Sequence, residues 1–144
     1  MKSVYFQNTL RLIAVIQCTL GIGYLLFPSA MLAAMDQSPA AADLHWPLGM
    51  LAARFIGYGA GLWLISRDPL PHLLWIRLMG GIQLLDLLVE VNLVMAGSLT
   101  LGQVGIAMFN AVWIGLFCLL ASPRTTAASP SAPTPPATKP AQSL

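Results

Sequence analysis

The sequence predicts an all-α protein, a four-transmembrane-helix bundle with both termini in the cytoplasm (N-in/C-in) and a disordered C-terminal tail. Hydrophobic residues make up 57% of the 144 residues and charged residues only 8%, whereas a soluble domain carries about 25% charged residues. Four apolar segments are each long enough to cross a bilayer. These observations define one membrane domain, residues 1–121, followed by a tail, residues 122–144.

Each predicted span is bounded by residues that interrupt an apolar helix. A bilayer core of about 30 Å requires about 20 apolar residues in a helix. The spans are expected, in chain order, at residues 8–28, 47–66, 72–96 and 101–121. Pro28 ends the first, Pro69 and Pro71 precede the third, and Gly97 separates the third from the fourth. The chain therefore divides into four separate helices.

The first apolar segment also fits a cleaved signal peptide, because Lys2 and Arg11 precede it and small residues follow it. Its apolar stretch, residues 12–27, is long for a signal peptide. Removal of this segment would leave three spans and place the two ends of the chain on opposite sides of the membrane. A retained first helix is therefore the favoured interpretation.

The lysine and arginine residues set the expected orientation. If the N-terminus is inside, the cytoplasmic segments contain Lys2, Arg11, Arg67, Arg124 and Lys139. The two outer loops, residues 29–46 and 97–101, contain no lysine or arginine. Cytoplasmic loops are enriched in these residues, so both termini are expected in the cytoplasm. Trp46, Trp63 and Trp75 lie near helix ends, where amphipathic rings favour the headgroup region.

The composition changes abruptly after the fourth span. Residues 122–144 are mainly proline, alanine, serine and threonine. Such a segment cannot bury enough apolar surface to offset the entropy of ordering it, so a disordered cytoplasmic tail is expected. A proline-rich docking motif is the alternative, but Pro133, Pro135 and Pro136 do not form a convincing ligand pattern.

Three charged residues fall deep inside the predicted spans: Arg54 in the second, and Asp86 and Glu90 in the third. Arg11 and Arg77 lie nearer the cytoplasmic ends of their spans, and Arg77 is expected to extend to the headgroups. A charged side chain at a helix centre costs about 2.5–3.5 kcal/mol on insertion scales, so such residues normally face the bundle. A rise of 1.5 Å per residue places Arg54 about 10 Å, Glu90 about 9 Å and Asp86 about 15 Å below the outer ends of their helices. We expect Arg54 to pair with Glu90, with Asp86 or with both.

Other polar residues lie at similar depth. Gln83 shares a helical face with Asp86 and Glu90, and Tyr58 follows Arg54 one turn later. Gly57 and Gly61 lie on the same face of that helix and form a GxxxG pattern, which allows another backbone to approach closely. The predicted ligand-binding or structural polar cluster comprises Gln17, Arg54, Tyr58, Gln83, Asp86, Glu90 and Asn110.

The cluster has three interpretations. A buried arginine–carboxylate group can simply determine which helices are neighbours. However, two acids face one arginine, and two acids so close cannot both ionise cheaply in a low dielectric. The surplus acid would then carry a proton or bind a cationic or hydrogen-bonding ligand. Alternatively, the cluster opens to water or to a partner protein.

Several classes of function lack a matching motif. The sequence has no nucleophile–base constellation, phosphate loop, dinucleotide fingerprint or metal-ligand cluster. Cys18 and Cys118 are isolated in apolar segments and are expected to be packing residues. His45 and His72 are expected at opposite faces of the membrane, so they cannot share a metal. The formal charge of +2 forms no basic patch for nucleic acid. No cofactor, metal or catalytic residue is therefore predicted.

The layout resembles the DoxX-like superfamily of small four-helix bacterial membrane proteins, including its members of unknown function. The resemblance depends on glycines and a proline closing the first helix, an early arginine followed by glycines in the second, and glycines with buried acids in the third. The residues concerned are Gly21, Gly23, Pro28, Arg54, Gly57, Gly61, Gly80, Gly81, Asp86 and Glu90. It covers roughly residues 8–121 and implies a helical bundle in the bacterial inner membrane. Some relatives have quinone-associated redox or stress roles.

The favoured functional hypothesis is a non-catalytic membrane protein that binds a small molecule, a lipid or a partner protein at the Arg/Asp/Glu cluster. One alternative is the membrane subunit of a quinone-linked redox complex, with a quinone bound among the aromatic and acidic residues. The other is a small proton-coupled transporter, which would have to act as a homodimer because four helices are few for transport. The expected surroundings are the lipid bilayer, without nucleic acid.

Overall fold

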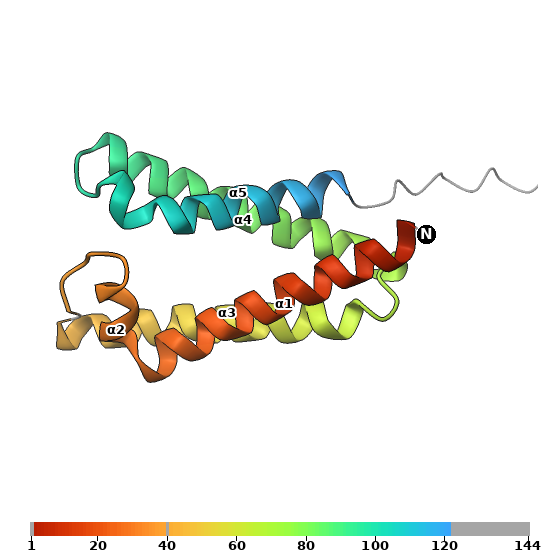
Figure 1. Cartoon of the computed structure of the whole chain (residues 1–144), viewed down its shortest axis with the longest axis horizontal. Coiled ribbons are helices and arrows are strands. Elements are labelled where there is room, and N and C mark those ends of the chain that lie inside the picture. The colour runs from red at the N-terminus through yellow and green to blue at the C-terminus, as the bar shows by residue number, and fades with distance from the viewer. Residues whose placement is uncertain (1, 40, 122–144) are drawn as a thin grey trace, which may run out of the picture.

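The computed structural model describes residues 2–39 and 41–121 as helices joined by short connections (Figure 1). Its α-helices are α1 (Lys2–Leu26), α2 (Pro28–Ala33), α3 (His45–Ile65), α4 (Leu73–Met95) and α5 (Leu101–Leu120). Single 3-10 turns precede α3 and α4, at Ala42–Leu44 and Leu70–His72. The described residues contain no β-strand, and four of their helices, α1, α3, α4 and α5, are long and apolar enough to cross a membrane. The predicted tail, residues 122–144, lies outside the described residues.

The helix boundaries agree with the predicted spans except at the start of the chain. The first helix begins at Lys2, well before residue 8, because Phe6 is buried and its ring stacks on Phe117 of α5 at 5.5 Å between centroids. Packing against α5 therefore stabilises the first turns of α1, which hydropathy alone does not include in the predicted span. Pro28 follows α1 as predicted, and it also begins the short helix α2, where a missing backbone N–H is tolerated.

The long helices form two antiparallel pairs, α1 with α3 and α4 with α5. Small residues allow close approach within each pair. A Cβ added to Gly59 of α3 would lie 2.7 Å from the carbonyl oxygen of Ala14 in α1. A Cβ added to Gly80 of α4 would lie 3.1 Å from the carbonyl oxygen of Gly115 in α5. The hydrophobic effect does not drive helices together within a bilayer, so close packing contacts of this kind are what stabilise their association.

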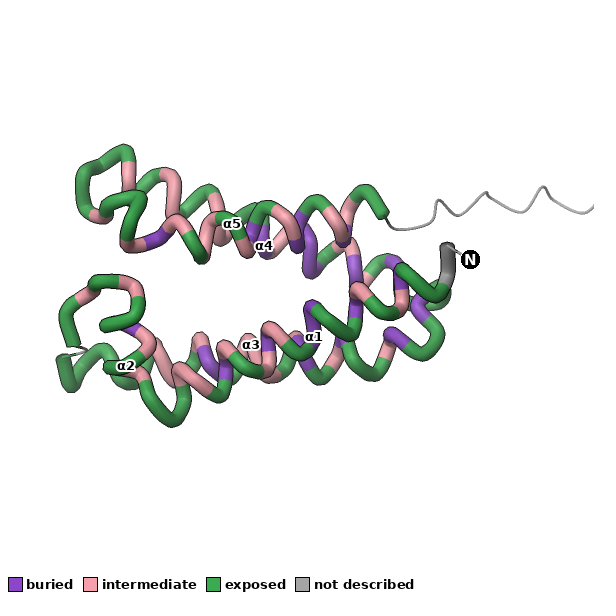
Figure 2. The backbone as a smooth tube through the Cα atoms, viewed as in Figure 1, coloured by how far each residue is buried: buried purple, intermediate pink, exposed green. Residues whose placement is uncertain are grey.

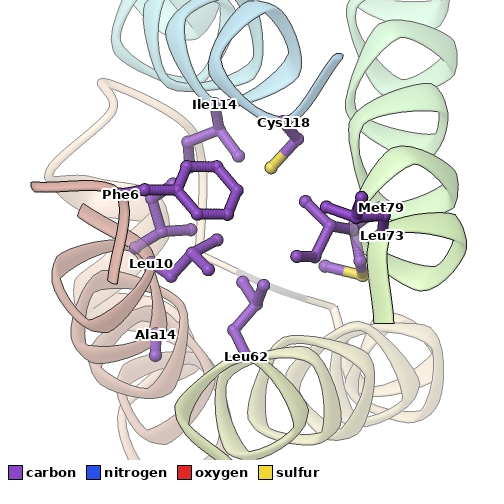
Figure 3. Close-up of a cluster of buried hydrophobic side chains, with 10 residues drawn as sticks. Phe6, Leu10, Ala14, Leu62, Leu73, Met79, Ile114 and Cys118 are labelled. Atoms are coloured by element: carbon purple, nitrogen blue, oxygen red, sulfur yellow. The ribbon is translucent and has the colours of Figure 1, made fainter. Parts of the chain in front are cut away.

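The two pairs converge at one end of the molecule and diverge toward the other (Figure 1). We call the first the core end, since it holds the start of α1, the α3–α4 connection and the end of α5. The other, the loop end, holds α2 and the two remaining connections. All four long helices contribute apolar side chains that point toward a common centre at the core end (Figure 3). This core consists of Phe6, Leu10, Ile13, Ala14, Leu62, Leu73, Ile76, Met79, Ile114 and Cys118.

Burial falls away toward the loop end, where both pairs are mainly half-buried or exposed (Figure 2). Large apolar side chains such as Leu85 and Leu88 of α4 and Ile106 of α5 are exposed along the helices. Exposed apolar surface on this scale, along helices long enough to cross a bilayer, is typical of contact with a membrane. The fold is thus that of a multi-pass membrane protein whose two helix pairs meet at one end.

Candidate functional site

An ion pair links the two helix pairs on the loop side of the core. Arg54 Nη2 of α3 lies 2.8 Å from Asp86 Oδ2 of α4. Arg54 lies eight residues beyond the core residue Leu62, and Asp86 lies seven residues beyond the core residue Met79. Both side chains remain partly exposed, at 36% and 28%. Arg54 was predicted to pair with Glu90, with Asp86 or with both, and the structure shows the pair with Asp86.

Aromatic rings surround the arginine. Its guanidinium carbon lies 5.8 Å from the ring centroid of Phe55 and 5.9 Å from that of Tyr58, which is within the range of a cation–π interaction. Tyr58 in turn meets Trp75 of α4 edge to face, at 6.5 Å between centroids. Tyr58 thus lies beside Arg54, and its part in a binding site stays a prediction. Trp75 packs against the core rather than acting simply as an anchor in the headgroup region.

Glu90 is the second acid of α4 near Arg54, and it takes no part in the Arg54–Asp86 ion pair. Its Oε2 atom is shielded and has no hydrogen-bond partner among the described residues. Glu90 interacts electrostatically with Asp86 on the same helix and with Tyr24 on α1. The part of the chain that the structure describes contains no ion pair between Arg54 and Glu90. The expected surplus of one carboxylate is thus present, and Glu90 carries it.

Two buried amides lie between the core and the ion pair. Gln17 of α1 is completely buried, and both its Nε2 and Oε1 lack a partner among the described residues. Gln83 of α4 is 3% exposed, and its Nε2 lacks one as well. Gln17 lies one turn beyond the core residue Ile13, and Gln83 one turn beyond Met79. A buried amide without hydrogen bonds costs about 1–3 kcal/mol, so these groups need an explanation.

Asn110 is placed differently from the other predicted members. Its Oδ1 accepts a hydrogen bond of 3.2 Å from Trp113 Nε1 on the same helix. No hydrogen bond joins it to Arg54, Asp86 or Glu90 within the described residues. Its membership of the cluster therefore stays a prediction.

The predicted GxxxG contact is wrong in its detail. A Cβ added to Gly61 would lie 2.7 Å from the ring of Trp75, so Gly61 accommodates a side chain rather than a neighbouring backbone. A Cβ added to Gly57 would have nothing within 4 Å. The close backbone contacts of α3 are made instead by Ala52 and Gly59, which face α1. The face of α3 that carries Arg54 is thus turned toward α4 by Trp75 and Asp86.

Two apolar grooves open elsewhere on the helices. One lies along α4, beside Leu88 and Asn92, and the other lies between α1 and α3, beside Cys18 and Trp63. Neither groove is lined by the charged cluster. Within residues 2–39 and 41–121 there is no group of three His, Cys, Asp or Glu side chains that could hold a metal ion. Among the described residues, the charges and buried amides therefore make up the candidate site.

Two residues of the site were not predicted from the sequence. Tyr24 of α1 lies near Glu90, and its ring is tilted against that of Phe55 at 6.2 Å between centroids. Both belong to apolar segments in which aromatic residues are unremarkable. Only the rotation of α1 and α3 about their axes brings the two rings beside the charged residues, so no sequence signal identified them.

Comparison of the chain with protein-family models, with curated proteins and with solved structures finds no match. The resemblance to the DoxX-like superfamily consequently stays a prediction, and the residues of the site are the basis for functional inference.

Proposed function

We propose that this protein is a non-catalytic multi-pass membrane protein that binds a small molecule or lipid between its two helix pairs, at the site formed by Arg54, Asp86 and Glu90. The observation that supports this most strongly is the surplus carboxylate of Glu90, which the Arg54–Asp86 pair leaves uncompensated. A charge kept inside a bilayer without a partner is expensive, and functional sites are where such residues are retained.

The buried polar atoms around the site that lack hydrogen-bond partners agree with a role in binding a ligand. A purely structural cluster would satisfy its own polar groups, because an unsatisfied buried group lowers stability. Here Gln17, Gln83, Arg54 and Glu90 each retain at least one buried atom without a partner among the described residues. Donors and acceptors are both left over, so a polar ligand group or an ordered water can satisfy them.

The side of the membrane on which the site lies is inferred from the charge pattern of the sequence. We propose that the core end faces the cytoplasm, because Arg11 and Arg67 lie there and the loop end contains no lysine or arginine in residues 29–46 or 97–101. The site would then be reached from the outer half of a bacterial inner membrane. Membership of the DoxX-like superfamily is part of the same proposal.

Native mass spectrometry tests the proposed function. The full chain is extracted in mild detergent from the membranes in which it was produced, and the masses of retained molecules are measured. We expect one predominant adduct on the wild-type protein, lost from Glu90→Gln and Asp86→Asn but kept by Leu85→Ala, a change at an exposed apolar position of α4. An adduct indifferent to both amide substitutions would contradict the proposal.

The identity of the adduct also separates the rival functions. A retained quinone would favour the redox-subunit alternative, and a dimer held together only when Glu90 is present would favour the transporter alternative. A bare protein in every sample would leave the cluster with a structural role, in which the Arg54–Asp86 pair determines how α3 meets α4.

A further inference from the structure

An apolar groove runs between α1 and α3 on the surface of that helix pair. It extends from Ala14 to Ile22 on α1 and from Ala60 to Leu64 on α3, and its volume is about 380 Å³. Its lining is apolar apart from one threonine and one tryptophan, and most of the lining residues are exposed. Both helices are long and apolar enough to cross a membrane. In a bilayer the groove therefore meets lipid hydrocarbon, and an apolar chain fits it.

Two arginines lie just beyond the groove, toward the core end of the molecule. On α1, Arg11 is three residues before Ala14, so it lies on the helical face that forms the groove. On α3, Trp63 lines the groove, and Arg67 follows it by four residues, just after the helix ends. Because α1 and α3 are antiparallel (Figure 1), both arginines belong to the same end of this helix pair. The apolar groove thus ends at two cationic side chains.

Hydrogen bonds between α1 and the end of α3 hold the two arginines at one level. Arg11 Nε donates to Ser66 Oγ at 3.3 Å, and Gln7 Nε2 donates to the backbone carbonyl oxygen of Arg67 at 3.1 Å. Both arginines are exposed. The bond to Ser66 uses one of the five N–H donors of a guanidinium group, and the Arg67 side chain makes no hydrogen bond among the described residues. Most of their donors can therefore bind a ligand.

The positive charge at this end of the groove is not neutralised by a neighbouring acid. The ion pair found among the described residues joins Arg54 to Asp86, on other parts of the helices. Asp68 is next to Arg67 in the sequence, but within the described residues it forms no ion pair with either arginine. Basic side chains at the end of a membrane helix attract anionic lipid headgroups. The charge and the groove together therefore fit an anionic lipid.

The length of the groove matches the depth of one leaflet. Arg11 and Ile22 are eleven residues apart, which is about 16 Å along a helix axis. Half of a hydrocarbon core of about 30 Å is about 15 Å. A phospholipid with its phosphate at the arginines would therefore extend an acyl chain to the far end of the groove. Trp63, which is 47% exposed, lies near the arginines, where an indole N–H can donate to a lipid ester.

We propose that the groove between α1 and α3 binds one anionic phospholipid, with an acyl chain along the groove and the phosphate group on Arg11 and Arg67. Phosphate oxygens accept the hydrogen bonds that guanidinium groups donate, so charge and hydrogen bonding agree. A zwitterionic lipid carries its own cation beside the phosphate, and that cation would be repelled by the two arginines. The groove is separate from the site at Arg54, Asp86 and Glu90.

Lipids with identical acyl chains test the preference for an anionic headgroup. The full-length protein, freed of co-purified lipid in mild detergent, is heated while its tryptophan fluorescence is recorded. Dioleoyl phosphatidylglycerol, dioleoyl phosphatidylcholine or inorganic phosphate is added in increasing amounts. We expect phosphatidylglycerol to raise the midpoint of unfolding in a saturable way, and phosphatidylcholine to require a concentration higher by about tenfold or more. Inorganic phosphate should have no effect, because it has no apolar chain to fill the groove.

Matched variants test the location of the lipid. Arg11→Gln and Arg67→Gln should each weaken the affinity for phosphatidylglycerol about fivefold, because each removes one positive charge from the headgroup site. Arg77→Gln removes the same charge from α4 and should leave the affinity unchanged. Ala60→Leu should weaken binding by filling the groove. Ala53→Leu should not, since position 53 is exposed two turns away on the same face of α3 and lies outside the groove.

Each contrary outcome overturns a particular part of the proposal. Equal stabilisation by the two lipids would overturn the anionic headgroup, and an equal response to inorganic phosphate would overturn the lipid. Selectivity that survives both arginine substitutions would place the headgroup elsewhere. A lipid-free dimer that Ala60→Leu converts to a monomer would show that a second copy of the chain occupies the groove. The comparison of lipids on the wild-type protein needs no variant to fold, and it is independent of the adduct test at Glu90.

Discussion

Gln17 and Gln83 are the side chains whose placement is hardest to explain by stability alone. Each is almost fully buried, and two side-chain atoms of Gln17 and one of Gln83 have no partner among the described residues. Leucine would fill similar space without a desolvation cost, so the amides lower the stability of the ligand-free protein. Their presence is explained if a bound ligand completes the hydrogen bonds of these two amides. The two residues therefore connect the energetics of the fold to its proposed function.

Replacement of Gln17 by leucine should reveal both effects of the buried amide, the lower stability of the ligand-free protein and the stronger binding of a ligand. We expect Gln17→Leu to stabilise the ligand-free protein by about 1–2 kcal/mol, because it removes an unsatisfied buried amide from a closed environment. The same change should weaken ligand binding. Thermal unfolding in detergent, with and without the adduct, measures both effects. Gln7→Leu is the matched control, since Gln7 lies near the core end and donates to the carbonyl oxygen of Arg67; it should give no stabilisation.

The Arg54–Asp86 pair should behave as a coupled unit. Asp86→Leu leaves Arg54 without a counter-charge, and Arg54→Met leaves Asp86 in the same condition, so each single change should destabilise the protein by about 1–3 kcal/mol. The double variant should be more stable than the sum of the two single effects predicts. Unfolding midpoints of the four proteins form the complete cycle. Additive effects would mean that the two side chains do not interact.

An ion pair between Arg54 and an acid of α4, with one acid left over, was predictable from the sequence; which acid pairs with Arg54 was not. Arg54, Asp86 and Glu90 share a depth because helical rise is constant, so their common layer follows from counting residues. Which acid meets the arginine depends on how α3 and α4 are rotated about their axes, and Trp75 against Gly61 helps to set that rotation. Hydropathy and spacing carry no information on such a contact.

Helix α3 has three faces with different surroundings. One face meets α1 through Ala52 and Gly59, another carries Arg54 toward α4, and a third, with Gly57 and Ala60, is exposed. The lengths of the four spans were predictable from apolar content. The assignment of the close-packed glycine was not, because Gly57, Gly59 and Gly61 are equally small and differ only in what lies opposite.

A pair of alanine substitutions should separate these faces. Gly59→Ala places a methyl group against the backbone of α1, where the nearest carbonyl oxygen is only 2.7 Å away, so it should destabilise the protein by about 1–3 kcal/mol. Gly57→Ala has nothing within 4 Å and should be neutral or slightly stabilising. Both variants have the same chemistry and nearly the same depth. Equal unfolding midpoints would show that α1 does not contact α3 at Gly59.

For the molecule as a whole, the orientation in the membrane is the prediction with the widest consequences. Positions at the loop end and the core end should differ in their reaction with a membrane-impermeant maleimide. In a background with Cys18 and Cys118 replaced by alanine, Ser38→Cys should be labelled in intact cells, and Asp68→Cys only after permeabilisation. Both positions are exposed. The opposite pattern would place the core end outside and would reverse the direction from which the site is reached.

The connection at residues 66–72 bears on how the molecule assembles. Within the described residues it is the only covalent link between the α1–α3 pair and the α4–α5 pair, so we expect each half to enter the bilayer as a self-contained hairpin. Until the halves dock, Arg54 on one hairpin and Asp86 and Glu90 on the other face lipid without each other. We therefore expect docking of the two hairpins to be favoured by formation of the Arg54–Asp86 ion pair, which neither hairpin can make alone.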